Sequence, residues 1–281
     1  GVRVGVHGEI DLIIEDLIAR AKRAGHTAPL DHYRTRPPAS ETLAILKLLE
    51  LAYWTRVKLH VFHASQPRSV ELVSWFKAQG VDVTVETCPH YLLLDAAADL
   101  PRVKAFAKIN PCILMQKERE ELWAHVLAGR IDFIASDHAP WPLERKQKEN
   151  FFENASGAPG LETSLPLMHD ALVVKRKQDP SLLARLISAN PARRFALAPR
   201  KGSIALGADA DFAVLDPRRP FTVEAKKSYS SAKWSPYDGW TTQGRVIRTI
   251  LRGRTIYDGE KVVGPAGFGQ FLPGPGYAGK A

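Results

Sequence analysis

Short apolar runs alternate with longer amphipathic segments from residue 1 to about residue 190. Four of the runs are rich in β-branched or aromatic residues and are bounded by polar or turn residues, which is typical of buried strands. The segments between them repeat apolar residues at helical spacing. This order predicts βα units around a parallel sheet. The predicted strands are Val2–Val6, Val57–Phe62, Val81–Glu86 and Ile131–Ala135.

Each predicted helix carries one apolar face. Ser40 and Glu41, which follow Pro37-Pro38, are typical of a helix start and predict where the second helix begins. The apolar positions that define the four helices are Leu12, Ile13, Leu17 and Ile18; Leu43, Leu46 and Leu49–Leu51; Val70, Val73 and Phe76; and Leu122, Val126 and Leu127.

The pattern becomes Gly-rich and strand-like after residue 190. Residues 201–217 and 245–264 alternate in polarity, and Gly-Arg and Asp-Gly pairs separate the alternating runs as turns. We therefore expect two parts, an α/β part at residues 1–198 and a β-rich part at residues 199–281. The end of the second part is dense in Gly and Pro, which predicts an irregular tail.

The composition is that of an ordinary globular protein. The chain has 281 residues, of which 45% are hydrophobic and 25% charged. It contains no apolar stretch long enough to span a membrane, and its first residues lack the features of a secretory signal. Two cysteines, Cys88 and Cys112, form no CxxC pair and are too few for a disulfide framework. We therefore expect a cytoplasmic protein with no membrane partner.

The formal net charge of +9 raises nucleic acid as a partner, because clustered Lys and Arg attract phosphate. The basic residues, however, are scattered as doublets and triplets, without a run of five or a recognisable reading motif. This distribution favours a solvated surface. We therefore expect no nucleic-acid partner, and failure to bind DNA or RNA at any salt concentration would exclude that alternative.

Residues that can bind a metal ion stand at the ends of three predicted strands. His7 follows the first strand, His63 the second, and Asp137 with His138 the fourth. In parallel βα folds the loops after the strands form the open mouth of the sheet. Imidazole nitrogens and carboxylates are ligands that zinc favours. A lone His is more often structural, but three such positions at one rim indicate a metal site.

Other histidines carry weaker signals. His60 lies three residues before His63, on the opposite face of the strand, so we interpret it as structural. His90 lies just past the third strand, where it could line the mouth or be structural. We also interpret as structural the histidines in helix or loop contexts, which are His26, His32, His125 and His169.

A series of strings along the chain resembles the amidohydrolase superfamily, and within it the cyclic-amidase branch of hydantoinases, dihydropyrimidinases, allantoinases and dihydroorotases. The likeness runs nearly from end to end. Each string alone is a weak signal, whereas the whole series in this order is specific. The strings are VHGE, VFHAS, VETCPHYLLL, KINPCIL, ASDHAP, SGAPGLETSLPL, NPARRFAL, KGSIALGADADFAVLD and WSPYDGWTTQGRVIRTILRG.

The resemblance implies an α/β fold, here strands five to eight of a (β/α)8 TIM barrel with part of a small β-sandwich. It also implies a binuclear metal centre, usually zinc. His7 and His63 match the metal ligands after the fifth and sixth barrel strands, and Asp137 matches the ligand after the eighth. In the family this Asp is also the catalytic base. It takes a proton from a metal-bridging hydroxide that attacks the amide carbonyl, and delivers it to the departing nitrogen.

The resemblance further implies an HxH pair after the first barrel strand and a carboxylated lysine after the fourth, and neither occurs here. We therefore expect an N-terminally truncated chain that holds at most a partial zinc site. Alone, it should be inactive and prone to aggregate through exposed sheet edges. When complete, the protein is expected to form a homo-oligomer, as the family usually does.

Three residues bear on the small-molecule substrate. By the resemblance, Asn110 matches a contact to the ring amide and Ser156 lies near a second one, with loop capping as the alternative for both. Trp141 stands where dihydroorotases commonly carry a His that holds the substrate carboxylate, which favours a neutral ring. We predict hydrolysis of a C–N bond in a hydantoin, dihydropyrimidine or allantoin-type ring. Dihydroorotase is the alternative, because Asn110 and the GLETSLPL string also occur in such sequences.

A different class of function is a non-catalytic homologue that acts as an assembly protein. Such a protein is expected to lose its metal ligands. The presence of His7, His63 and Asp137 together therefore favours an enzyme.

Overall fold

The computed structural model describes residues 3–274, which form two compact units. The first comprises residues 3–162 and 224–238, and the second comprises residues 163–223 and 239–274 of the described part. Because a compact unit and a sequence domain need not share a boundary, the division expected after residue 198 stays a prediction.

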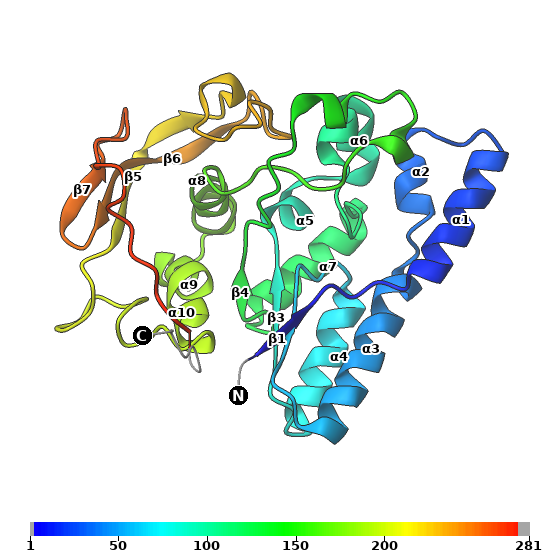
Figure 1. The fold of residues 1–281 in the computed structure, drawn as a ribbon, viewed down its shortest axis with the longest axis horizontal. Helices are drawn as coiled ribbons and strands as arrows, with labels where there is room; N and C mark the ends of the chain where they lie inside the picture. The colour runs from blue at the N-terminus through cyan, green and yellow to red at the C-terminus, as the bar shows by residue number, and fades with distance from the viewer. Residues whose placement is uncertain (1–2, 275–281) are drawn as a thin grey trace. The chain divides into compact units, whose positions relative to one another are not determined.

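The first unit contains a parallel sheet whose strand order follows the chain, β1-β2-β3-β4. Three of these strands, β1, β3 and β4, are labelled in Figure 1. All four predicted strands are confirmed, although each is shorter than its apolar run. Among residues 3–274 these strands form an open sheet and close no barrel. The strands are β1 (Val4–Val6), β2 (Leu59–Val61), β3 (Val83–Thr87) and β4 (Phe133–Ile134).

Helices connect the strands of this unit, and the four predicted ones are confirmed. The second of them begins at Pro38 rather than at Ser40, because the fixed φ of proline suits the first turn of a helix. The helices are α1 (Asp11–Arg23), α2 (Pro29–Arg34), α3 (Pro38–Thr55), α4 (Pro67–Ala78), α5 (Pro89–Leu93), α6 (Ala96–Val103) and α7 (Gln116–Leu127).

The core of the first unit lies where α3 and α4 pack against the sheet. Leu49 of α3, Val73 of α4, and Val61 and Val85 of the strands are all fully buried there. Burying an aliphatic side chain of this size contributes about 1.5–3 kcal/mol. This packing fixes the direction of the strands and therefore the position of the loops that follow them.

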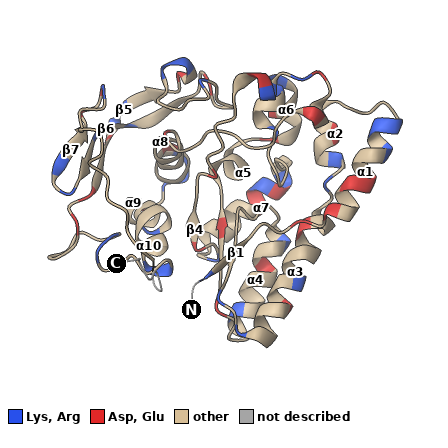
Figure 2. Cartoon of the chain, in the orientation of Figure 1, with Lys and Arg blue, Asp and Glu red and all other residues tan. Residues whose placement is uncertain are grey.

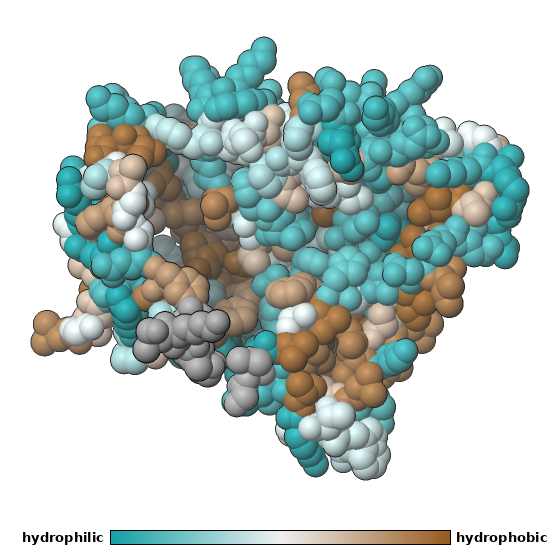
Figure 3. Space-filling model, in the orientation of Figure 1, coloured by the Kyte–Doolittle hydropathy of each residue, from teal (hydrophilic) through white to brown (hydrophobic). Residues whose placement is uncertain are grey.

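The outer surface of α3 and α4 carries large apolar side chains beside charged ones such as Arg68 and Glu71, and Figure 3 shows hydrophobic side chains gathered over these helices. Leu43, Leu51 and Trp54 of α3 and Trp75 of α4 are among the exposed side chains. A contiguous apolar surface of this kind marks a contact site or an aggregation hazard. Charges elsewhere are mixed in sign, since α1 and α6 each carry both basic and acidic segments (Figure 2).

The second unit joins short helical segments to an antiparallel sheet of order β5-β6-β7. Arg252 and Gly253 turn the chain between β6 and β7, both at positive φ, as a tight hairpin requires. The predicted strand-like character is confirmed from residue 212 onward, whereas residues 201–211 form turns and bends without a strand. The elements are α8 (Ser164–Met168), α9 (Pro180–Ala184), α10 (Asn190–Arg194), β5 (Phe212–Thr222), β6 (Thr241–Leu251) and β7 (Arg254–Tyr257), with wider helical turns at His169–Lys175 and Arg185–Ala189.

Two further features of the chain bear on the sequence predictions. Residues 264–274 form neither helix nor strand, and the rest of the predicted irregular tail lies outside the described residues. Within residues 3–274, each helix is too short or too polar to cross a lipid bilayer.

Candidate active site

The predicted metal ligands all lie in the first unit, where the chain leaves the sheet. His7 directly follows β1, His63 lies two residues after β2, and Asp137 lies three residues after β4. His63 and Asp137 adopt positive φ angles of 35° and 45°. Such backbone conformations are strained for residues other than glycine and cluster at functional sites.

The structure brings His7 and His63 into direct contact. His7 Nδ1 lies 3.1 Å from His63 Nε2, with the two rings edge to face. His7 Nε2 lies 3.0 Å from Glu9 Oε2, which also accepts a bond from Arg36 at 2.5 Å. A carboxylate only accepts hydrogen bonds, so the His7 proton resides on Nε2. His7 Nδ1 therefore presents a lone pair towards His63, as in metal sites where a carboxylate orients the ligand.

Charges around this pair keep it ready to bind a cation. Burial raises the pKa of Glu9, but the bonds from His7 and Arg36 outweigh burial and lower it overall. Burial also lowers the pKa of His63, the neighbouring His7 lowers it further, and the Asp137 carboxylate opposes both. The lowered pKa favours the neutral form of the His63 imidazole, which is the form that binds metal.

The donor set fits part of a metal site. Two nitrogens bound to one tetrahedral zinc ion at about 2.0–2.1 Å lie about 3.3 Å apart, close to the separation of the His7 and His63 nitrogens. In addition, His63 Nδ1 is buried without a hydrogen-bond partner among residues 3–274. Within the same residues, however, no three His, Cys, Asp or Glu side chains are grouped to hold a metal ion. The charge of Asp137 thus acts on His63, but Asp137 does not form a group of three metal ligands with His7 and His63.

Two more histidines lie beside this pair. His60 is buried and bonded to Thr84 Oγ1 at 2.8 Å and to Glu86 Oε2 at 3.2 Å. His90 is buried in α5, and its Nε2 has no partner among the described residues. Burial, together with the charge of His63, lowers the pKa of His90 to about 3. His90 therefore adds a neutral imidazole beside the pair.

Asn110 lies in the loop that leads to α7, and its surroundings hold it from two sides. His32 Nε2 donates to the Ile109 carbonyl at 3.0 Å, and Tyr91 donates to the Pro111 carbonyl at 2.9 Å. The side-chain oxygen of Asn110 is buried and has no partner in the part of the chain that the structure describes. An unsatisfied buried acceptor is costly, so this oxygen is available to an N–H donor of a bound molecule.

Trp141 and Ser156 are brought together by a hydrogen bond from the indole N–H to the Ser156 carbonyl at 2.7 Å. The Arg145 guanidinium lies over the indole ring, 5.1 Å from its centre. Gly157 has φ 115°, and a Cβ there would lie 2.6 Å from that of Ala139. A glycine is therefore required at this turn, and Trp141 uses its one donor on the loop rather than on a ligand.

Some residues with a role at the site were missed from the sequence. Glu9 had a signal, since it lies two residues after a candidate ligand. His138 gives a weaker signal, because in the sequence it only follows the stronger candidate Asp137. In the structure its Nδ1 accepts from the Gly160 and Leu161 amides at 3.1 and 3.2 Å. Its ring therefore anchors the loop after Gly157.

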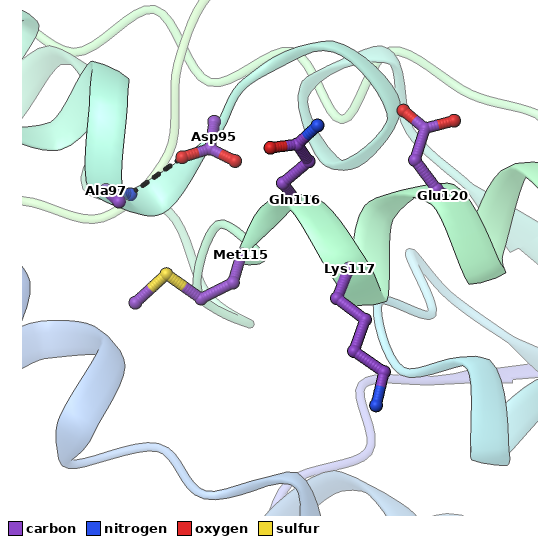
Figure 4. Close-up of a pocket in the computed structure, with 6 residues that line it drawn as sticks. All are labelled: Asp95, Ala97, Met115, Gln116, Lys117 and Glu120. Atoms are coloured by element: carbon purple, nitrogen blue, oxygen red, sulfur yellow. Dashed lines mark hydrogen bonds between the residues drawn. The ribbon is translucent and has the colours of Figure 1, made fainter.

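A separate hollow of about 540 Å³ lies between the starts of α6 and α7 (Figure 4). It contains none of the predicted site residues. Asp95 faces it and is already used as a helix cap, accepting from the Ala97 amide at 2.9 Å. The hollow is lined by Asp95, Ala97, Met115, Gln116, Lys117 and Glu120.

Acid is expected to destabilise the first unit through His32 and His90. Burial lowers both pKa values from 6.5 to about 3, so the unfolded chain binds more protons between these limits. The free energy of unfolding should therefore fall as pH drops from 6.5 to 3, by about 1.4 kcal/mol per pH unit for each histidine. Denaturant titrations across this pH range measure the change in the free energy of unfolding.

His32→Gln, which keeps a donor for the Ile109 carbonyl, should remove one histidine's share of the slope of unfolding free energy against pH. His26→Gln, which replaces an exposed histidine, should leave that slope unchanged. Equal slopes in all three proteins would contradict the assignment.

The sequence model of the amidohydrolase family matches residues 39–256. This match covers most of the chain, and the chain belongs to that family. The similar proteins lie in the cyclic-amidase branch, so the resemblance read from the motifs is confirmed. Enzymes of this family are generally metal-dependent.

Two curated relatives are allantoinases. The chain is 42% identical to allantoinase of Rubrobacter xylanophilus over 268 residues, covering 95% of this chain and 59% of that protein. It is 37% identical to allantoinase of Deinococcus radiodurans over 264 residues, covering 94% and 58%. The chain thus spans somewhat less than two thirds of the length of these relatives.

Solved structures of the same branch are also similar. L-hydantoinase (dihydropyrimidinase) from Arthrobacter aurescens aligns with a TM-score of 0.93 at 32% identity, covering 96% of this chain and 60% of that one. D-hydantoinase (dihydropyrimidinase) from Thermus sp. aligns with a TM-score of 0.90 at 28% identity, with the same coverage. These neighbours imply a fold of the TIM-barrel type.

Proposed function

We propose that the protein containing this chain hydrolyses the ring C–N bond of a cyclic amide, with allantoin as substrate. The 42% identity to an allantoinase over 95% of the chain carries this proposal. The chain would then supply the C-terminal half of a (β/α)8 barrel. As proposed from the sequence, Asp137 is the catalytic base and His7, His63 and Asp137 are metal ligands.

The chemistry follows from the groups gathered after the strands. A divalent ion, when bound, polarises the amide carbonyl and lowers the pKa of the attacking water. Glu9, itself held by Arg36, accepts the proton on His7 Nε2 and so keeps the ring in the tautomer whose Nδ1 carries no proton. Asp137 accepts the proton of the water as the C–O bond forms, and returns it to the ring nitrogen as the C–N bond breaks.

Substrate recognition is proposed for the loops of Asn110 and Ser156. The unpartnered side-chain oxygen of Asn110 can accept a ring N–H, and hydantoin-type rings carry such donors beside each carbonyl. The indole of Trp141, held against the Ser156 carbonyl, is proposed to line the same site. A hydantoin or dihydropyrimidine is the second candidate substrate, because the similar solved structures are hydantoinases.

A substrate panel tests the proposal. The protein as its gene encodes it is assayed with allantoin, hydantoin, dihydrouracil and dihydroorotate, before and after a chelator removes divalent metal. Allantoin is expected to give the highest kcat/KM, and chelation should abolish turnover until zinc is restored. The highest kcat/KM for dihydroorotate would favour the alternative from the sequence. No turnover of any compound would favour a non-catalytic homologue.

A further inference from the structure

Two lysines are buried beneath the loops that carry Asn110 and Ser156. Lys146 is 3% exposed and Lys108 is 6% exposed. Within residues 3–274 neither forms an ion pair with a carboxylate, and the acceptors of both ammonium groups are backbone carbonyls. Burying a charge without an opposite charge costs free energy, and burial lowers the pKa of Lys146 to about 7. Such a group needs a reason other than stability.

The Lys146 ammonium joins two loops. It donates to the carbonyl of Lys108 at 3.1 Å, of Ala155 at 2.8 Å and of Gly157 at 2.9 Å. An ammonium has three N–H donors, and all three are used here. Ala155 and Gly157 flank Ser156, while Lys108 lies two residues before Asn110. A single side chain therefore holds the backbone on both sides of one proposed substrate contact and close to the other.

The surroundings leave the ammonium little freedom to shift. The Gly157 amide donates to the Lys108 carbonyl at 2.8 Å, so a backbone bond reinforces the tie between the loops. The ring of Trp234 lies 5.1 Å from the Lys146 nitrogen, close enough for a cation–π contact. Without the Lys146 ammonium, the carbonyls of Ala155 and Gly157 would lose the donor that holds them. The loops would then be linked by the backbone bond from Gly157 to Lys108 and by the Lys108 ammonium, which donates to the Phe152 and Asn154 carbonyls before Ser156.

We infer that Lys146 is a positioning residue that sets the separation between Asn110 and Ser156, and so the fit of the substrate ring between them. This inference rests on the proposed function. Lys146 touches neither the imidazole pair nor Asp137 through any hydrogen bond of the described residues. The loss of the Lys146 side chain should therefore weaken substrate binding more than it slows bond cleavage. Weaker binding raises KM, whereas kcat should change less.

Lys146→Met tests the inference, because methionine fills a similar volume without donors. In the protein as its gene encodes it, kcat/KM for allantoin is expected to fall by about 100-fold, as for a misplaced substrate, with KM carrying more than tenfold of the loss. Hydrogen–deuterium exchange of peptides from residues 154–161 should become at least tenfold faster. A merely structural role would lower kcat with the fraction of folded protein and leave KM unchanged.

Matched variants separate charge, donors and location. Lys146→Arg keeps a buried cation with several donors and is expected to recover at least half of the KM change on a logarithmic scale. Lys148→Met removes an exposed lysine from the same loop and is expected to change neither KM nor exchange. If Lys146→Met lacks the wild-type circular-dichroism spectrum, Lys146→Gln, which retains two donors, replaces it with the same expected division between KM and kcat.

The outcomes distinguish the inference from the function on which it rests. No turnover by the wild-type protein on the whole panel overturns both. Turnover by the wild-type protein with an unchanged KM in Lys146→Met overturns the inference alone. The inference is likewise overturned if Lys148→Met raises KM as much as Lys146→Met, because the effect would then belong to the loop as a whole.

Discussion

Replacing Asp137 by Asn is expected to lower kcat for cyclic-amide hydrolysis by about 10²–10⁴-fold, the usual contribution of a positioned general base. Asparagine has nearly the same shape, but its amide cannot take up the proton of the attacking water. Asp137 is suited to this role because its charge acts on His63, although the two residues follow β4 and β2, which are separated by β3 in the sheet. Steady-state kinetics on the best substrate of the panel measure the effect.

The control for this variant is Asp16→Asn, which removes an exposed carboxylate of α1 paired with Arg20 at 2.8 Å. It should change kcat less than twofold, because exposed ion pairs contribute little. Metal content is measured alongside, so that loss of a ligand can be separated from loss of the base. A kcat for Asp137→Asn within tenfold of wild type would refute the catalytic role.

Glu41→Ala is expected to lower the free energy of unfolding by about 3 kcal/mol or more. Glu41 of α3 is buried and accepts from Ser65 and Ser69 hydroxyls at 2.5 and 2.6 Å and from the Gln66 amide at 2.9 Å. Burial raises its pKa despite these bonds. Each buried donor left without a partner costs about 1–3 kcal/mol, and alanine would leave several.

The loss of Glu41 should also disturb the candidate active site, because Ser65, which Glu41 binds, lies two residues after His63 in the connection between β2 and α4. Urea unfolding followed by circular dichroism measures the stability change. Glu50→Ala, which removes an exposed carboxylate bonded to Trp54 on the same helix, should cost less than about 1 kcal/mol. Equal losses of unfolding free energy in Glu41→Ala and Glu50→Ala would show that the buried hydrogen bonds of Glu41 do not stabilise the fold.

The sequence was sufficient for the parts of the fold that depend on local periodicity. Apolar runs located all four strands of the first unit, and helical spacing located the helices between them. The predicted strands were too long, because residues such as Val57 and Val81 are apolar but lie just outside the segment that pairs with the next strand. The contact between His7 and His63 could be expected for a similar reason, since the ends of adjacent parallel strands meet at one edge of the sheet.

The rest depends on long-range geometry that leaves no local pattern. Lys146 stands in the charged run ERKQKEN, which favours a solvated surface, yet its burial is decided by loops that fold over it. Glu41 was interpreted as part of a helix start, whereas its carboxylate reaches the connection before α4. The proposed roles of Asn110, Ser156 and Trp141 in substrate binding stay predictions.

The strand order of the first unit has a consequence for how the protein is made. Each strand pairs with the strand synthesised just before it, so most of the sheet can form in steps as the chain leaves the ribosome. Residues 224–238 break this sequence, because Trp234 donates to the Trp141 carbonyl across 93 positions. At about 5–20 residues per second, residues 163–223 delay their arrival by roughly 3–12 s. During that interval the surface that receives Trp234 is open to chaperones and proteases.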